Sequence, residues 1–203
     1  MATEVDIANQ ALARVGSADI MSLGDADDEN ARVVNRFYAQ TVKECLRAHP
    51  WSCATGRTTL ARLTETPEFG YDYYFQLPND FMRALYLNDI NVWDPLDCWA
   101  IEQDRILSDE EAIKLVYVKY DEDATTYDDL LVNAIVIKLA AKIVGSLTGE
   151  MGRAATFLAE FQVIMSEAKT VDARETNSNE NNPLQGMLAR SPLSRRRRFS
   201  PLG

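Results

Sequence analysis

Residues 130–147 read LLVNAIVIKLAAKIVGSL, and this stretch decides the architecture of the chain. Its apolar side chains cover most of a helical cylinder, and only Lys138 and Lys142, four residues apart, form a clear polar strip. A helix that is apolar nearly all round is buried within its own domain or against another subunit. Central lysines would each cost about 3 kcal/mol in a bilayer, so we expect a buried core helix and no membrane span.

Three more helices are expected around this one. Toward the C-terminus, Gly145 and Gly149 break the pattern and another amphipathic helix follows. At the N-terminus, Thr3 and Asp6 have the spacing of a capping box, and Gly16 is a natural stop for a short first helix. A longer helix begins in the acidic run of residues 25–29 and ends at Pro50.

The segment between the first two helices carries three large apolar side chains. They are Ile20, Met21 and Leu23, in a loop otherwise rich in small and acidic residues. Because large apolar side chains favour burial, we expect all three to be buried in the core.

Between residues 58 and 120 the period of the pattern changes from helical to two. Residues 71–77 and 113–118 alternate in the manner of strands, and six of the eight tyrosines fall in this segment. Residues 102–105 have the character of a hairpin turn. Shorter strand candidates are Thr59–Leu63, Ala84–Leu87, Trp99–Glu102 and Arg105–Leu107.

The predicted fold is therefore mainly α with an inserted antiparallel β lobe, an α+β arrangement with a four-helix body and an extended C-terminal tail. We place the N-terminal helices of the body in residues 1–57 and the β-rich insertion in residues 58–121. The C-terminal helices of the body occupy residues 122–175, and residues 176–203 form the tail.

Charge is distributed unevenly along the 203 residues. The net charge is −10, but residues 1–175 hold 16 basic and 30 acidic side chains, whereas residues 176–203 carry +4. An acidic body argues against general binding of nucleic acid by the whole protein. Three cysteines without framework spacing, and a start that lacks the features of a signal peptide, favour a reduced intracellular setting.

The tail combines regularly spaced Pro-Leu pairs, which are apolar, with a run of four arginines. Pro-Leu pairs recur every nine residues, and proline keeps such a segment extended. The arginines could contact an acidic protein partner or nucleic-acid phosphates, or they could form a solvated chain end. The regular spacing of the Pro-Leu pairs favours a protein partner with a groove that accepts them. The candidate partner-binding residues are Pro183, Leu184, Pro192, Leu193, Arg195, Arg196, Arg197, Arg198, Phe199, Pro201 and Leu202.

Residues for catalysis or metal binding are scarce. Any histidine-dependent hydrolase must use His49, the single histidine. Cys45 and Cys53 flank it at four-residue spacing, which could supply zinc ligands, but a fourth ligand is missing and Pro50 interrupts the helix. We therefore expect no catalytic residue, no cofactor and no metal, and we rank a His49 hydrolase last.

Several segments, in this order, resemble a known family. The matching stretches are residues 11–16 (ALARVG), Ile20, residues 22–23 (SL), residues 47–51 (RAHPW), residues 69–83 (FGYDYYFQLPNDFMR), residues 99–120 and residues 126–149. Together they resemble the head-to-tail connector proteins of short-tailed bacteriophages, of the type called tail tubular protein A. The likeness covers roughly residues 5–175.

The resemblance implies a non-enzymatic structural protein of the virion tail and neck, assembled in the host cytoplasm. Such adaptors form a homo-oligomeric ring, typically twelve-fold, beneath the portal protein, and double-stranded DNA passes through it without specific binding. The resemblance implies that the helical body contacts neighbouring subunits, the C-terminal segment docks on the portal, and the β lobe faces the tail nozzle protein. The alternative is a nucleic-acid-binding module that acts through Arg195–Arg198.

Overall fold

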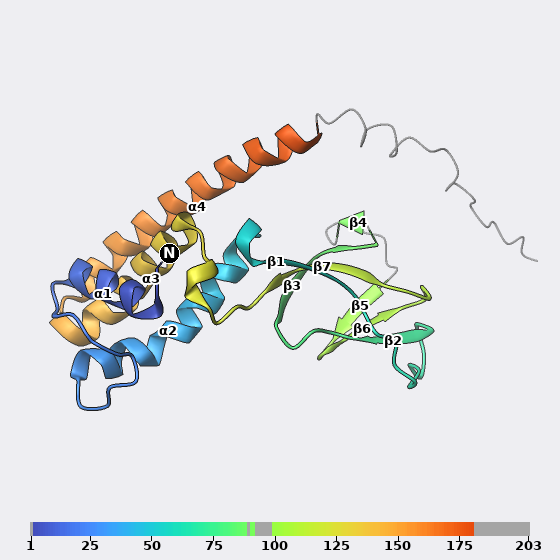
Figure 1. Ribbon diagram of the computed structural model, residues 1–203, viewed down its shortest axis with the longest axis horizontal. Helices are drawn as coiled ribbons and strands as arrows, with labels where there is room; N and C mark the ends of the chain where they lie inside the picture. The colour runs from blue at the N-terminus through green and yellow to red at the C-terminus, as the bar shows by residue number, and fades with distance from the viewer. Residues whose placement is uncertain (1, 89, 92–98, 181–203) are drawn as a thin grey trace, which may run out of the picture. The chain divides into compact units, whose positions relative to one another are not determined.

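The computed structural model describes residues 2–88, 90–91 and 99–180 (Figure 1). The chain divides into two compact units, Met1–Met165 and Ser166–Gly203. The first unit contains a helical body, every strand that the structure describes, and the first half of the last helix.

The described residues form four α-helices, as predicted: α1 (Glu4–Val15), α2 (Glu29–Ala48), α3 (Asp129–Thr148) and α4 (Met151–Glu180). The strands lie between α2 and α3 in the chain, so the β lobe is an insertion into the helical body (Figure 1). The structure is thus the α+β fold that the sequence predicts.

The helix ends are fixed by capping residues that can be recognised in the sequence. The Thr3 hydroxyl accepts from the Asp6 amide, and the Asp6 carboxylate accepts from the Thr3 amide at 2.9 Å, which completes the capping box. Gly16 ends α1 with a φ of 82°, a left-handed conformation that glycine adopts at little cost. Asp28 and Asp128 cap α2 and α3 through their carboxylates.

Helix α3 is the centre of the helical body. Both α1 and α2 pack against it, and the Phe161 ring of α4 lies 4.8 Å from the ammonium group of Lys138. Its buried residues are Leu131, Val132, Ala134, Ile135, Val136, Ile137, Leu139, Ala140, Ala141, Ile143 and Val144. In the described part of the chain, α3 is also the one helix long and apolar enough to cross a membrane, and 61% of its most apolar window is buried inside the protein.

The polar strip of α3 is neutralised from α2. Glu44 accepts from Lys138 at 3.1 Å and from Lys142 at 2.9 Å. Partial burial pushes the pKa of Glu44 upward, but the hydrogen bonds from Lys142 and Lys138 outweigh it and hold the pKa below its ordinary value. One carboxylate thus allows two lysines to lie between packed helices.

Replacing the carboxylate tests this arrangement. In Glu44→Gln, both lysines lose their counter-charge, and we expect the free energy of unfolding at pH 7 to fall by about 1–2 kcal/mol. A lowered folded-state pKa stabilises the fold above the unfolded pKa, and this stabilisation is lost as the pH falls through the folded value. Urea unfolding from pH 7 to pH 3 should therefore show the two proteins converging in acid. A difference that persists unchanged at pH 3 would contradict the ion-pair role, and the exposed control Glu68→Gln should stay within about 0.5 kcal/mol.

The larger sheet forms the base of the β lobe. Its strand order is β1 (Thr55–Thr59), β7 (Lys114–Lys119), β3 (Phe81–Leu87) and β4 (Ile90–Asn91), and every pairing is antiparallel. Strands β1 and β7 pair from Thr55 opposite Val118 to Thr59 opposite Lys114. The segments that join the lobe to the helical body are therefore held side by side.

A smaller sheet completes the lobe. It has the order β2 (Tyr73–Gln76), β6 (Arg105–Ser108) and β5 (Trp99–Glu102), again antiparallel, with the predicted turn between β5 and β6. One apolar cluster spans the two sheets and gives the lobe its own core. Its buried members are Leu60, Phe75, Leu77, Ala84, Leu87, Ile106, Ile113, Leu115 and Tyr117.

The strand predicted at Thr59–Leu63 is wrong in position. The strand ends at Thr59, and the next residue, Leu60, donates its amide to the Ile113 carbonyl at 2.9 Å. The Leu63 amide instead donates to Tyr74 in β2. The predicted segment fails as one strand because the chain crosses from the larger sheet to the smaller one within it.

The loop before α2 also differs from expectation. Ile20 is buried as predicted, and the Asn9 side chain bonds both of its backbone groups, at 2.8 and 3.0 Å. Leu23 is only half-buried, and Met21 is 93% exposed, so the predicted burial of Met21 is wrong. The pinning of Ile20 turns the next side chain away from the core.

Helix α4 continues to Glu180, five residues into the segment predicted as an extended tail from residue 176. Loss of the apolar pattern predicts an end near residue 176, but α4 contains no proline, and the next proline after it is Pro183. The rest of the predicted tail, from residue 181 onward, lies outside the described residues.

Candidate functional site

The inner side of α4 covers the core of the helical body. Phe157, Phe161, Ile164 and Met165 recur at helical spacing, and all four are buried. Burial of such side chains contributes about 1.5–3 kcal/mol each, which fixes this side of the helix inward.

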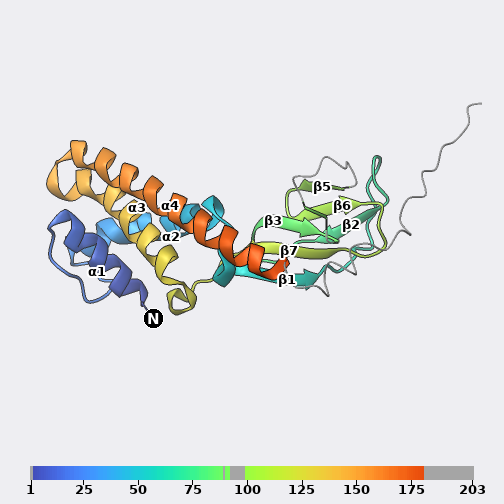
Figure 2. The same cartoon turned by 90° about the horizontal axis from the view of Figure 1, so that it is seen from above.

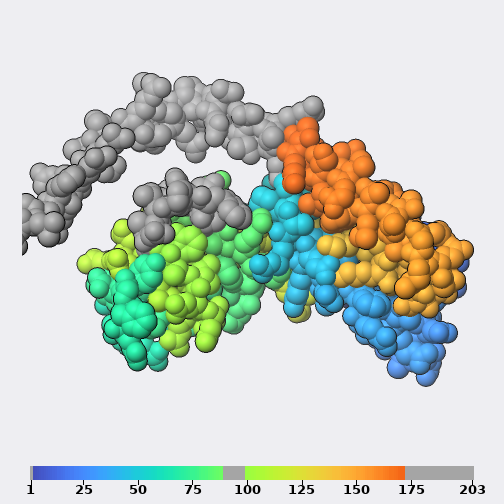
Figure 3. Space-filling model, turned by 180° about the vertical axis from the view of Figure 1, so that it is seen from behind, coloured from blue at the N-terminus to red at the C-terminus, as the bar shows by residue number. Residues whose placement is uncertain are grey.

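Between Met151 and Met165, the opposite side of α4 is exposed and carries no charged side chain. Met151, Leu158 and Val163 are 76%, 49% and 59% exposed. We call this surface the α4 face, and Figure 3 shows the first half of α4, in orange, open on the surface of the molecule. The α4 face consists of Met151, Gly152, Ala155, Thr156, Leu158, Ala159, Gln162 and Val163.

The charged residues of α4 between Met151 and Met165 are directed elsewhere. Arg153 donates to the Arg14 carbonyl at 3.0 Å and to Glu150 at 3.0 Å, and its guanidinium lies 5.7 Å from the Phe157 ring. Glu160 accepts from Arg14 at 2.7 Å. Both residues bond the end of α1, and Arg153 also bonds Glu150, the residue before α4, so neither places a charge on the α4 face.

An uncharged outer face is unusual for a surface helix, whose solvent side normally carries charged and polar groups. It is more unusual on a helical body that is itself acidic, with 11 basic and 17 acidic side chains in residues 1–57 and 122–175. Exposed apolar side chains gathered on one element mark an interaction surface more strongly than a single exposed side chain does. The α4 face is therefore the strongest candidate for a protein contact in the helical body.

The position of this face answers a question that the sequence left open. The all-round apolar helix, α3, is covered mainly within its own chain, so its composition needs no second subunit. The apolar surface left for a partner belongs to α4. The sequence-based prediction did not include this face. Its sequence signal is the helical spacing of uncharged residues on one side of the helix, at Met151, Ala155, Leu158, Ala159 and Gln162.

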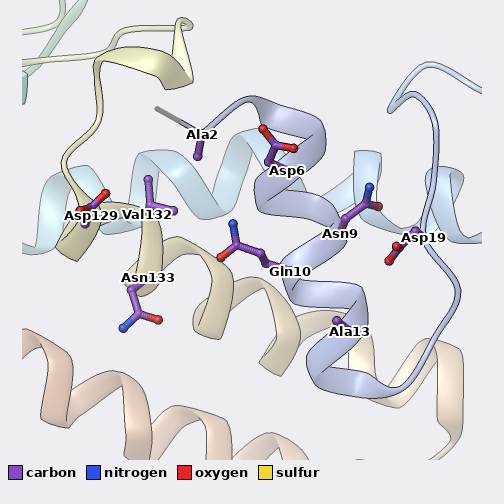
Figure 4. A pocket seen from close by; sticks show the side chains of 9 residues that line it. All are labelled: Ala2, Asp6, Asn9, Gln10, Ala13, Asp19, Asp129, Val132 and Asn133. Carbon is purple, nitrogen blue, oxygen red and sulfur yellow. The ribbon is translucent and has the colours of Figure 1, made fainter.

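A groove of about 850 Å³ lies between α1 and α3 (Figure 4). Its lining includes three carboxylates, Asp6, Asp19 and Asp129, and no basic side chain. Backbone and side-chain hydrogen bonds from Thr3 hold the pKa of Asp6 below its usual value, so this carboxylate stays charged. The groove is acidic and repels phosphate.

The zinc ligand candidates are not brought together. The buried His49 ring packs edge-on against Trp51 with the ring centroids 4.9 Å apart, and Cys45 is buried in α2. Burial raises the pKa of the Cys45 thiol to about 12, which opposes formation of the thiolate that a metal requires. Cys53 contacts the Asp128 carboxylate instead, at 3.7 Å. Within the described ranges, no cluster of three or more His, Cys, Asp or Glu residues could hold a metal.

The predicted partner-binding residues of the tail, Pro183 to Leu202, all lie outside the described residues. No protein-family model matches the chain, and no curated protein matches it.

Proposed function

We propose that this chain is a structural adaptor of the head-to-tail junction in a short-tailed bacteriophage and works as one copy in a ring beneath the portal. The observation that carries the proposal is the α4 face, an apolar surface without charge on an acidic helical body. Such a surface gains free energy when a second protein covers it. A second copy of the same acidic chain can approach there without like-charge repulsion.

Two further features support an adaptor. The β lobe has its own core, so it can contact a tail nozzle protein while the helical body contacts neighbouring copies. The body and its α1–α3 groove are acidic, which suits a conduit that double-stranded DNA passes without being held. The resemblance over residues 5–175 joins these features to a phage neck.

A charge placed on the α4 face tests the proposal. In the double variant Ala155→Glu, Ala159→Glu, each interface gains carboxylates in an apolar contact, and we expect ring formation on portal rings to weaken at least tenfold. Negative-stain electron microscopy and sedimentation of protein mixed with portal rings measure this. The isolated variant should keep the circular dichroism and urea midpoint of the unmodified protein, since both positions are exposed.

The matched control is Ala39→Glu, an exposed alanine on α2 outside the α4 face. It introduces the same side chain into a helix and should assemble normally. Normal ring formation by the α4 double variant would overturn the role of the α4 face. Failure of the unmodified protein to form any ring with portal would overturn the adaptor proposal itself.

Removal of the tail tests portal docking. Deleting residues 181–203 keeps α4 whole and removes every candidate docking residue. We expect a folded protein that no longer joins DNA-filled heads, because the Pro-Leu pairs and arginines proposed to contact the portal have been removed. Head-to-tail joining in a complementation assay, with circular dichroism as the folding control, measures this. Normal joining by the truncated protein would exclude the tail as the anchor.

The arginine run tests the nature of the tail's partner. Replacing Arg195–Arg198 with alanine should weaken portal docking more at low salt than at high salt, because screening reaches only about 8 Å at 0.15 M but about 30 Å at 0.01 M. A loss that does not depend on salt would contradict an electrostatic contact. A gel shift of duplex DNA by the tail peptide, with a steep salt slope, would instead favour the nucleic-acid-binding alternative.

A further inference from the structure

The exposed Met21 lies on a loop whose backbone is held in place. Both backbone groups of its neighbour Ile20 bond the Asn9 side chain, and Asn30 donates to the Ala18 carbonyl at 2.9 Å. Ile20 itself is inserted into the core. The loop, residues 17–28, therefore presents Met21 from a preorganised backbone, which reduces the entropy lost when the side chain meets a partner.

The chemistry around Met21 limits the surfaces that it can contact. Asp19, Asp25, Asp27 and Asp28 lie in the same loop, so another acidic surface would repel it. The α4 face carries no carboxylate. An unbranched thioether adapts its shape to apolar surroundings, and the small residues Ala155 and Ala159 leave room beside larger apolar neighbours on that face.

A closed ring requires two different surfaces on each copy, because a head-to-tail contact joins one patch to another. Figure 2 shows the first half of α4, up to Met165, along one edge of the helical body and the loop that joins α1 to α2 along the opposite edge. These two surfaces therefore meet the geometric requirement of a head-to-tail contact.

We propose that Met21 of one copy packs against the α4 face of the next copy, so that loop 17–28 and α4 form the two halves of the subunit contact. This inference rests on the proposed ring and specifies which surfaces meet. Met21 acts as an apolar anchor, and the acidic residues beside it lie at the rim, where they keep the contact in one orientation.

Cross-linking between copies tests the contact. In a Cys53→Ser, Cys98→Ser background, one preparation carries Met21→Cys and a second carries Ala159→Cys. Mixed, assembled on portal rings and mildly oxidised, they should yield a disulfide-linked dimer, because a disulfide requires Cα atoms about 4.4–6.8 Å apart. Neither preparation alone should cross-link. The matched control is Phe69→Cys mixed with Ala159→Cys, since Phe69 is exposed but belongs to the β lobe.

A charge variant provides a second measurement that does not depend on disulfide geometry. Met21→Asp should weaken ring assembly at least tenfold while Met21→Leu, which keeps an apolar side chain, assembles within threefold of the unmodified protein. Both should keep the unmodified urea midpoint, because residue 21 is exposed.

The outcomes separate this inference from the adaptor proposal. If rings form, Met21→Asp assembles normally and no cross-link joins residues 21 and 159, the contact is overturned and the adaptor remains. A cross-link in the Ala159→Cys preparation alone would show two α4 faces meeting, which also overturns it. If the unmodified protein forms no ring, the adaptor proposal and the contact that rests on it both fail.

Discussion

The surface of helix α3 is apolar except for the strip formed by Lys138 and Lys142, so other helices must cover it to exclude water. Helices α1, α2 and α4 do so, and Glu44 of α2 supplies the single carboxylate that both lysines need. This constraint determines which side of each surrounding helix faces inward. It also explains why α4, which uses its phenylalanines to cover the core, leaves an opposite side whose composition the core does not dictate.

The composition of that opposite side therefore carries information about function. A helix released from packing would be expected to gain lysines and glutamates, which favour solubility and helix formation. The α4 face has none, and Arg153 and Glu160 are both directed to Arg14 at the end of α1. This composition is the observation on which the proposed contact with a second protein rests.

Local rules predicted the helical body well and the loop and sheet details less well. The capping box at Thr3, the stop at Gly16 and the buried run after residue 130 depend on neighbours in sequence, and the structure confirms them. The crossing at Leu60 and the exposure of Met21 depend on partners far along the chain, Ile113 and Asn9. Sequence periodicity does not contain those contacts. The α4 face could have been predicted from its missing charges, whereas the tail prediction stays a prediction.

The pairing of β1 with β7 has an evolutionary consequence. The chain leaves the helical body through one strand and returns through its immediate neighbour, so the ends of the inserted lobe are close together. Insertions with adjacent ends can be lengthened, shortened or replaced with little effect on the host fold. The β lobe can therefore change in length or sequence without altering how the helices of the body pack.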